Sequence, residues 1–217
     1  MKKQLDKQAI LAKLSDGMTI MIGGFMANGA PEHLIDIVLE SGIKNITLIS
    51  TDTGTETTGS GRLISAKRIT KLYASHIGTN PETGRQMCND ELDVTLVPQG
   101  SLAEKIRAAG AGLGGVLTPT GLGTTIAEGK QIITIDGKDY LLEKPLHADL
   151  ALIRGSVVDS KGNTVYHGTT QNFNPLMATA ADTVIVEATQ LVETGTIAPE
   201  AVHTPGLFVD HIYAVEK

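Results

Sequence analysis

The chain has 217 residues, a formal net charge of −6 and a hydrophobic content of 41%. This length allows one α/β domain with a sizeable core. The acidic balance, together with the lack of basic stripes interleaved with aromatic residues, excludes nucleic acid as an expected partner.

The N-terminal segment and the cysteine content bear on location. Asp6, Lys7 and Lys13 interrupt any apolar stretch near the start, so this segment does not have the pattern of a secretory signal. No apolar run reaches the roughly 18 residues that a membrane span needs. The single cysteine, Cys88, cannot form an internal disulfide, which favours a reducing compartment. We expect a soluble, cytoplasmic protein with no membrane partner.

The first predicted elements are a strand, a glycine loop and a helix. The apolar run Met18–Ile22 ends in Gly23-Gly24-Phe25, and Pro31 opens the helical pattern Glu32–Glu40. Residues 24–29 match the first part of a nucleotide-binding P-loop. Ala30 and Pro31 replace the lysine and hydroxyl residue that hold phosphates and magnesium, so a nucleotide hydrolase is excluded. The remaining alternatives are a ligand-binding loop and an ordinary tight turn.

Short β-branched runs recur along the rest of the chain, a pattern typical of buried parallel strands. They are Ile46–Ser50, Lys71–Ile77, Val94–Val97, Leu150–Val158 and Thr183–Val186. A helix is predicted over Ser101–Ala109, where Ser101 and Glu104 have the spacing of a capping box and Gly110 follows as a stop. Another helix is predicted to start near Asn174-Pro175 and to run through the segment 176–181, "LMATAA".

Two hairpin signals complete the predicted fold. They are the segment 159–163, "DSKGN", and the Asp136-Gly137 pair. Alternating strands and helices indicate an α/β fold with an open, mainly parallel sheet, flanking helices and a partly antiparallel C-terminal part. No linker or internal repeat interrupts the chain, so residues 1–217 are expected to form a single domain.

Gln99 is a candidate site residue because it follows the strand that ends at Pro98 and precedes a helix. Ligands of open α/β sheets bind at the carboxyl ends of strands. A glutamine amide there can donate a hydrogen bond to a carbonyl oxygen or an oxyanion. The structural alternative is that the Gln99 side chain forms hydrogen bonds only with nearby backbone.

Other catalytic patterns are missing from the sequence. The six histidines and the cysteine show no metal-ligand spacing, and no G-x-S-x-G motif occurs. Residues 110–115, "GAGLGG", match a dinucleotide fingerprint, but they follow a helical pattern where a strand is required. His76 lies at a strand end, and a structural role is favoured for it. The chain therefore has ligand-holding loops without a convincing nucleophile or metal site.

Several segments together resemble family I coenzyme A transferases. "DGMTIMIGGFMANGAP" (16–31) meets every fixed position of the first signature of that family. The resemblance continues through "SHIGTNPETG", "PQGSLAEKIRAAGAGLGG", "LTPTGLGT", "NFNPLMATAADTVIVEA" and "TPGLFVDHI", and so covers nearly the whole chain. Within the family, the chain resembles the α subunits most. Thr51 and Ala109 depart from the residues common in relatives, outside the signature.

The resemblance implies a heteromer, often α2β2, of this chain with a homologous β subunit. It implies CoA transfer between short-chain acyl-CoA and a carboxylate such as acetate, butyrate or acetoacetate. The nucleophilic glutamate is expected in the β subunit, with a glutamyl-CoA thioester as intermediate, no metal and no permanently bound cofactor. Residues matching the CoA- and acyl-binding segment are Gly23, Gly24, Phe25, Met26, Ala27, Asn28 and Gly29. Gln99 matches the family's glutamine in Pro-Gln-Gly, an oxyanion donor.

Two other classes of function remain open. The same broad fold hosts sugar-phosphate isomerases and ligand-sensing modules. An isomerase needs its own general base, and Asp52 is the only fair candidate. A pure interaction protein without site residues is the third possibility, against which the Gly-Gly-Phe and Pro-Gln-Gly segments speak.

Overall fold

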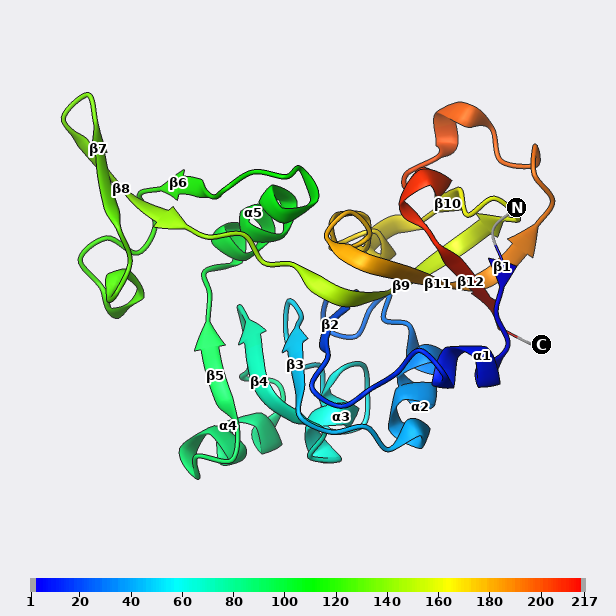
Figure 1. The fold of residues 1–217 in the computed structure, drawn as a ribbon, viewed down its shortest axis with the longest axis horizontal. Coiled ribbons are helices and arrows are strands. Elements are labelled where there is room, and N and C mark those ends of the chain that lie inside the picture. Colours follow the sequence, from blue (N-terminus) through cyan, green and yellow to red (C-terminus); the bar gives the residue numbers. More distant parts are fainter. Residues whose placement is uncertain (1–2, 216–217) are drawn as a thin grey trace.

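The computed structural model describes residues 3–215. Its main feature is a nine-stranded sheet in the order β1-β12-β11-β9-β2-β3-β4-β5, in which β10 pairs with β9 (Figure 1). The strands are β1 (Lys3–Gln4), β2 (Thr19–Ile22), β3 (Ile46–Ile49), β4 (Ile69–Ala74), β5 (Asp93–Leu96), β9 (Ala148–Asp159), β10 (Thr164–Val165), β11 (Ala181–Val192) and β12 (His211–Ala214). Only β10 runs antiparallel to its neighbour among these described strands.

Helices cover both faces of this sheet. They are α1 (Lys7–Leu11), α2 (Glu32–Ser41), α3 (Gly61–Ser65), α4 (Pro81–Cys88), α5 (Gln99–Gly110) and α6 (Asn174–Met177). Successive strand residues point to opposite faces. Ile20 and Ile22 therefore pack into the core that contains α1, α2 and α3, whereas Met21 packs into the core that contains α5 and α6. Burial on both faces explains why the predicted strands are continuous apolar runs.

A separate three-stranded sheet forms an arm beyond α5, at the upper left of Figure 1. It has the order β6-β8-β7 and consists of β6 (Val116–Thr118), β7 (Ile132–Ile135) and β8 (Lys138–Glu143). Asp136 (φ 50°) and Gly137 (φ 75°) form the turn between β7 and β8, as their sequence predicts. The second predicted hairpin, between β9 and β10, is also confirmed.

A buried carboxylate joins the arm to α5. Glu143 of β8 lies 2.8 Å from the Lys105 ammonium and 2.6 Å from the Lys130 ammonium. Burial by itself would raise the pKa of the Glu143 carboxyl, but the hydrogen bonds from the two lysines outweigh this effect and hold the pKa below its usual value. This triad fixes the arm against the helix that begins with Gln99.

One predicted helix start is wrong. Helix α5 begins at Gln99 with Pro98 as its N-cap, so Ser101 lies inside the first turn and cannot act as the cap. The Ser101 side chain is buried, and its hydroxyl has no partner within the described residues. Glu104 pairs with Arg107 instead of closing a capping box. Helix α5 includes Gly110, one residue beyond its predicted end, and α6 ends at Met177, short of the predicted run to residue 181. No helix within residues 3–215 has the length and apolar character that crossing a bilayer requires.

Candidate functional site

The glycine loop leaves the carboxyl end of β2 and contains a strained turn. Phe25 and Asn28 exchange two backbone hydrogen bonds of 3.0 and 2.9 Å across it. The two residues between them, Met26 (φ 51°) and Ala27 (φ 61°), are both left-handed although neither is glycine. Such conformations cost on the order of 1 kcal/mol or more each, and they persist at functional sites where the surroundings impose them. The turn exposes 48% of Phe25 and 47% of Met26.

Two glycines of the loop are required by packing within the chain. A Cβ at Gly23 would lie 1.9 Å from Oδ1 of Asn174, and one at Gly29 would lie 2.7 Å from the Thr170 carbonyl oxygen. Gly24 adopts φ +122°, a region that L side chains rarely adopt. The loop is thus more tightly constrained than an ordinary strand–helix turn.

Two asparagines of the segment leading into α6 hold the loop from the other side. Asn172 accepts a hydrogen bond from the Gly24 N–H at 3.2 Å and donates to the Asn28 carbonyl oxygen at 2.9 Å. Asn174, which is completely buried, donates to the Gly29 carbonyl oxygen at 3.1 Å. Sequence reasoning assigned no role to either residue. The only local signal was an Asn-x-Asn-Pro segment at a helix start.

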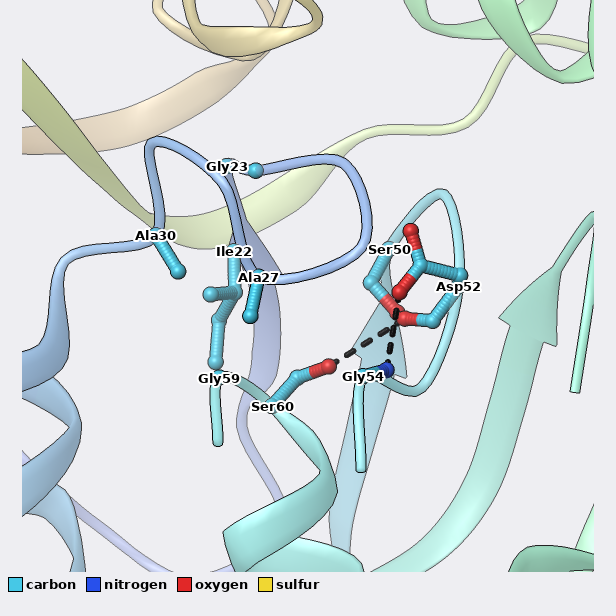
Figure 2. Close-up of a pocket in the computed structure, with 10 residues that line it drawn as sticks. Ile22, Gly23, Ala27, Ala30, Ser50, Asp52, Gly54, Gly59 and Ser60 are labelled. Atoms are coloured by element: carbon cyan, nitrogen blue, oxygen red, sulfur yellow. Dashed lines mark hydrogen bonds between the residues drawn. The ribbon is translucent and has the colours of Figure 1, made fainter. Parts of the chain in front are cut away.

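A second loop, at the carboxyl end of β3, lies against the first (Figure 2). Asp52 joins the two loops, because one carboxylate oxygen accepts the Met26 N–H at 2.8 Å and the other accepts the Gly54 N–H at 2.8 Å. The space enclosed between the loops measures only about 10 Å³. That is room for about one water molecule, so the two loops pack closely against each other here.

Gln99 is connected to the same two loops. The Ser75 hydroxyl at the end of β4 contacts Oε1 of Gln99 and lies 2.6 Å from the Thr51 carbonyl oxygen. The Thr51 hydroxyl lies 2.8 Å from the Gly24 carbonyl oxygen. With Oε1 facing Ser75, the Gln99 amide nitrogen makes no hydrogen bond to any residue between 3 and 215, and the side chain is exposed. The structure therefore brings Gln99 and the glycine loop to one edge of the sheet.

A buried carboxylate of β11 accepts hydrogen bonds from the first turn of helix α2, which follows the glycine loop. Glu187 accepts hydrogen bonds from the backbone N–H groups of His33 at 2.8 Å and Leu34 at 3.0 Å. Burial raises the pKa of the Glu187 carboxyl, although the hydrogen bond from the Leu34 N–H and the His33 ring oppose the rise. A carboxylate suits the positive end of a helix dipole. Glu187 therefore fixes where the helix starts and the loop ends.

The remaining candidates from the sequence do not form a catalytic group. His76 pairs with Asp52 through a backbone bridge at the ends of β4 and β3. In residues 3–215, no three His, Cys, Asp or Glu side chains are grouped so that they could hold a metal ion. The "GAGLGG" segment joins α5 to β6, which is the reverse of the strand-to-helix context of a dinucleotide fingerprint.

Comparison with known proteins adds independent information. The family model "Coenzyme A transferase" matches residues 5–215. The chain is 58% identical over 202 residues to the acetate CoA-transferase subunit alpha of Escherichia coli K12, covering 93% of this chain and 92% of that protein. It is also 58% identical over 197 residues to the acetoacetyl-CoA:acetate/butyrate CoA transferase alpha subunit of Clostridium acetobutylicum, covering 91% and 90%.

A solved structure agrees with the fold. A crystal structure of an acyl-CoA transferase from Escherichia coli O157:H7 superposes with a TM-score of 0.86 at 21% identity. The match covers 99% of this chain but 47% of the other, so this chain spans about half the length of that enzyme.

Proposed function

The chain belongs to the coenzyme A transferase family, and we propose that it is the α subunit of an enzyme that moves CoA between a short-chain acyl-CoA and a carboxylate. Acetate, butyrate and acetoacetate are the proposed acids. The observation that supports this most strongly is 58% identity, over more than nine-tenths of the chain, to two α subunits with these activities in their names. The chain would act as a single domain over residues 1–217.

The catalytic nucleophile is proposed to be a glutamate of a homologous β subunit, in an α2β2 assembly. Its carboxylate attacks the acyl-CoA thioester, which releases CoA thiolate and leaves an acyl-glutamyl anhydride. The thiolate then attacks the glutamyl carbonyl carbon, which releases the first acid and forms a glutamyl-CoA thioester. An incoming carboxylate reverses both steps. This is covalent catalysis that needs an oxyanion donor at each tetrahedral stage and no metal.

Gln99 is the proposed oxyanion donor of this chain. Its carbonyl oxygen faces Ser75, which leaves the amide nitrogen available to donate. It is the first residue of α5, a helix whose N-cap side chain makes no capping hydrogen bond. The free N–H groups and the positive end of the helix dipole favour negative charge at this place.

The glycine loop is proposed to bind the acyl-CoA on the same edge. Gly23, Gly24 and Gly29 keep the loop backbone close to the sheet, while Ala27 and Asn28 complete the turn. Phe25 and Met26 are exposed and can form a wall of the acyl pocket. Coenzyme A enters as a substrate in this scheme, and a cytoplasmic location fits the exposed free thiol of Cys88.

A stand-alone isomerase is less well supported by the geometry. Asp52, the only candidate for its general base, is 5% exposed and accepts hydrogen bonds from two backbone N–H groups. A carboxylate occupied in this way is poorly placed to take a proton from a substrate.

The test is steady-state kinetics of the chain co-expressed with its β subunit. Acetyl-CoA, butyryl-CoA and acetoacetyl-CoA serve as donors, and the corresponding acids serve as acceptors. We expect transfer among these three acids with preferences that differ modestly, because one methylene changes binding by only about 1–3 kcal/mol. No transfer with any pair, by a complex that size exclusion shows to be intact, would refute the proposed substrate class.

A further inference from the structure

We propose that Asp52 is a positioning residue, which holds the strained Met26–Ala27 turn in the conformation that presents the glycine loop to the acyl-CoA. The inference rests on the proposed function, since it concerns the loop that binds substrate there. It assigns to Asp52 a role that differs from general-base chemistry, because the carboxylate would act through the loop.

The Asp52 carboxylate makes hydrogen bonds to both loops. Oδ2 accepts the Met26 N–H at 2.8 Å and lies 2.7 Å from the Thr51 hydroxyl, while Oδ1 accepts the Gly54 N–H at 2.8 Å. Met26 and Gly54 belong to different loops, at the ends of β2 and β3. The Asp52 side chain therefore links the two loops, beside the contact of the Thr51 hydroxyl with the Gly24 carbonyl oxygen.

The Asp52 carboxylate is buried and depends on hydrogen-bond donors for its stability. Asp52 is 5% exposed, and no salt bridge to it is formed within residues 3–215. A buried charge without a cationic partner is unfavourable unless hydrogen-bond donors stabilise it. Here the donors are two backbone N–H groups and the Thr51 hydroxyl, so the carboxylate and the loop backbone stabilise each other.

The turn that Asp52 contacts has an unfavourable backbone conformation. Met26 and Ala27 are consecutive left-handed residues, and neither is glycine. The hydrogen bond to Asp52 is made by the first of them. Strained backbone of this kind persists only where its surroundings impose it. The two Phe25–Asn28 backbone hydrogen bonds close the turn, and the Asp52 carboxylate holds the first left-handed residue from outside it, so loss of the carboxylate would loosen the turn and move Phe25 and Met26.

The test uses Asp52→Asn in the co-expressed complex. An asparagine amide has one acceptor oxygen, so its nitrogen faces either the Met26 or the Gly54 N–H and one of the two bonds is lost. Asp159→Asn is the matched control. Asp159 is 2% exposed and lies in the β9–β10 turn, where Oδ1 accepts the Lys161 and Asn163 N–H groups and Oδ2 accepts the Asn163 side-chain amide, so its variant removes a buried carboxylate outside the glycine loop.

We expect Asp52→Asn to lower kcat at least 10-fold, whereas Asp159→Asn changes kcat less than twofold, with the melting temperature of both complexes measured alongside. The Asp52→Asn effect should shrink at least threefold when it is measured in an Ala27→Gly background, since glycine adopts the left-handed conformation without strain. A general base or a merely structural aspartate would not be rescued by this change. An equal effect in both backgrounds, or near wild-type kinetics of Asp52→Asn, would overturn the proposal.

Hydrogen exchange separates this proposal from the proposed function. Peptides covering residues 23–30 should exchange at least 10-fold faster in Asp52→Asn than in wild type. Their exchange rate should be unchanged in Asp159→Asn. If the wild-type complex transfers no CoA, the proposed function fails, and the exchange result alone decides the role of Asp52. Unchanged exchange of these peptides in Asp52→Asn would refute that role.

Discussion

Gln99→Ala should lower kcat of the assembled complex by about 100–1,000-fold, which corresponds to roughly 3–4 kcal/mol of lost transition-state stabilisation. The physical reason is that Gln99 is exposed at the start of α5 and its amide nitrogen makes no hydrogen bond within residues 3–215, so it can donate to an oxyanion. KM for acyl-CoA should change less, since a bond to an oxyanion strengthens in the transition state. Steady-state kinetics with size exclusion of the complex measures both quantities.

Two variants make the interpretation of Gln99→Ala specific. Gln99→Glu keeps the length and the acceptor for Ser75 but removes the donor, so it should be at least as impaired as the alanine variant. Gln190→Ala on β11, an exposed glutamine outside the site, should keep kcat within twofold of wild type. A fall of less than fivefold for Gln99→Ala would contradict the oxyanion assignment. Dissociation of the complex would show instead that Gln99 is structural.

Gly24→Val should leave less than about 1% of the transfer activity in a complex that still assembles. Gly24 has φ +122°, and a Cβ there would lie 3.2 Å from the backbone of Ala30. A β-branched residue rarely adopts this conformation and would push the loop backbone away from its place at the end of β2. Kinetics of the complex, together with its melting temperature, measure the effect.

Gly84→Val is the matched control for this glycine. Gly84 lies in α4, has no atom within 4 Å of an added Cβ and has no unusual φ. Activity should stay within about twofold of wild type. Gly24→Ala provides a milder change at the loop if the valine variant does not assemble, and it should also lower kcat. Wild-type kinetics of both Gly24 variants would contradict a role of the glycine loop in substrate binding and would show that it only connects β2 to α2.

Local patterns predicted those parts of the fold that depend on residues close in sequence. The strand, glycine loop and helix between Met18 and Ser41 follow from apolar periodicity, glycine and proline. Both hairpins follow from their turn residues. The Ser101 capping box is wrong because α5 begins two residues earlier, with Pro98 at the N-cap position, and a capping-box spacing cannot show which turn of a helix comes first.

The supports of the site depend on contacts that periodicity does not encode. Asp52 reaches Met26 across 26 residues, and Asn172 reaches Gly24 across 148. Such pairs form only once the sheet order β9-β2-β3 brings the strand ends together. Sequence reasoning therefore identified the glycine loop and Gln99 as candidates, but not the Thr51, Asp52, Ser75 and asparagine contacts that connect them. Their roles in transfer stay predictions.

The central claim is that this chain supplies half of a site whose nucleophile lies in the partner protein. Intact-mass spectrometry of the complex, after incubation with acyl-CoA alone and removal of free nucleotide, tests it most directly. The account predicts a CoA-sized mass increase, with loss of water, on the β subunit and an unmodified mass for this chain. A CoA adduct on this chain would contradict the account.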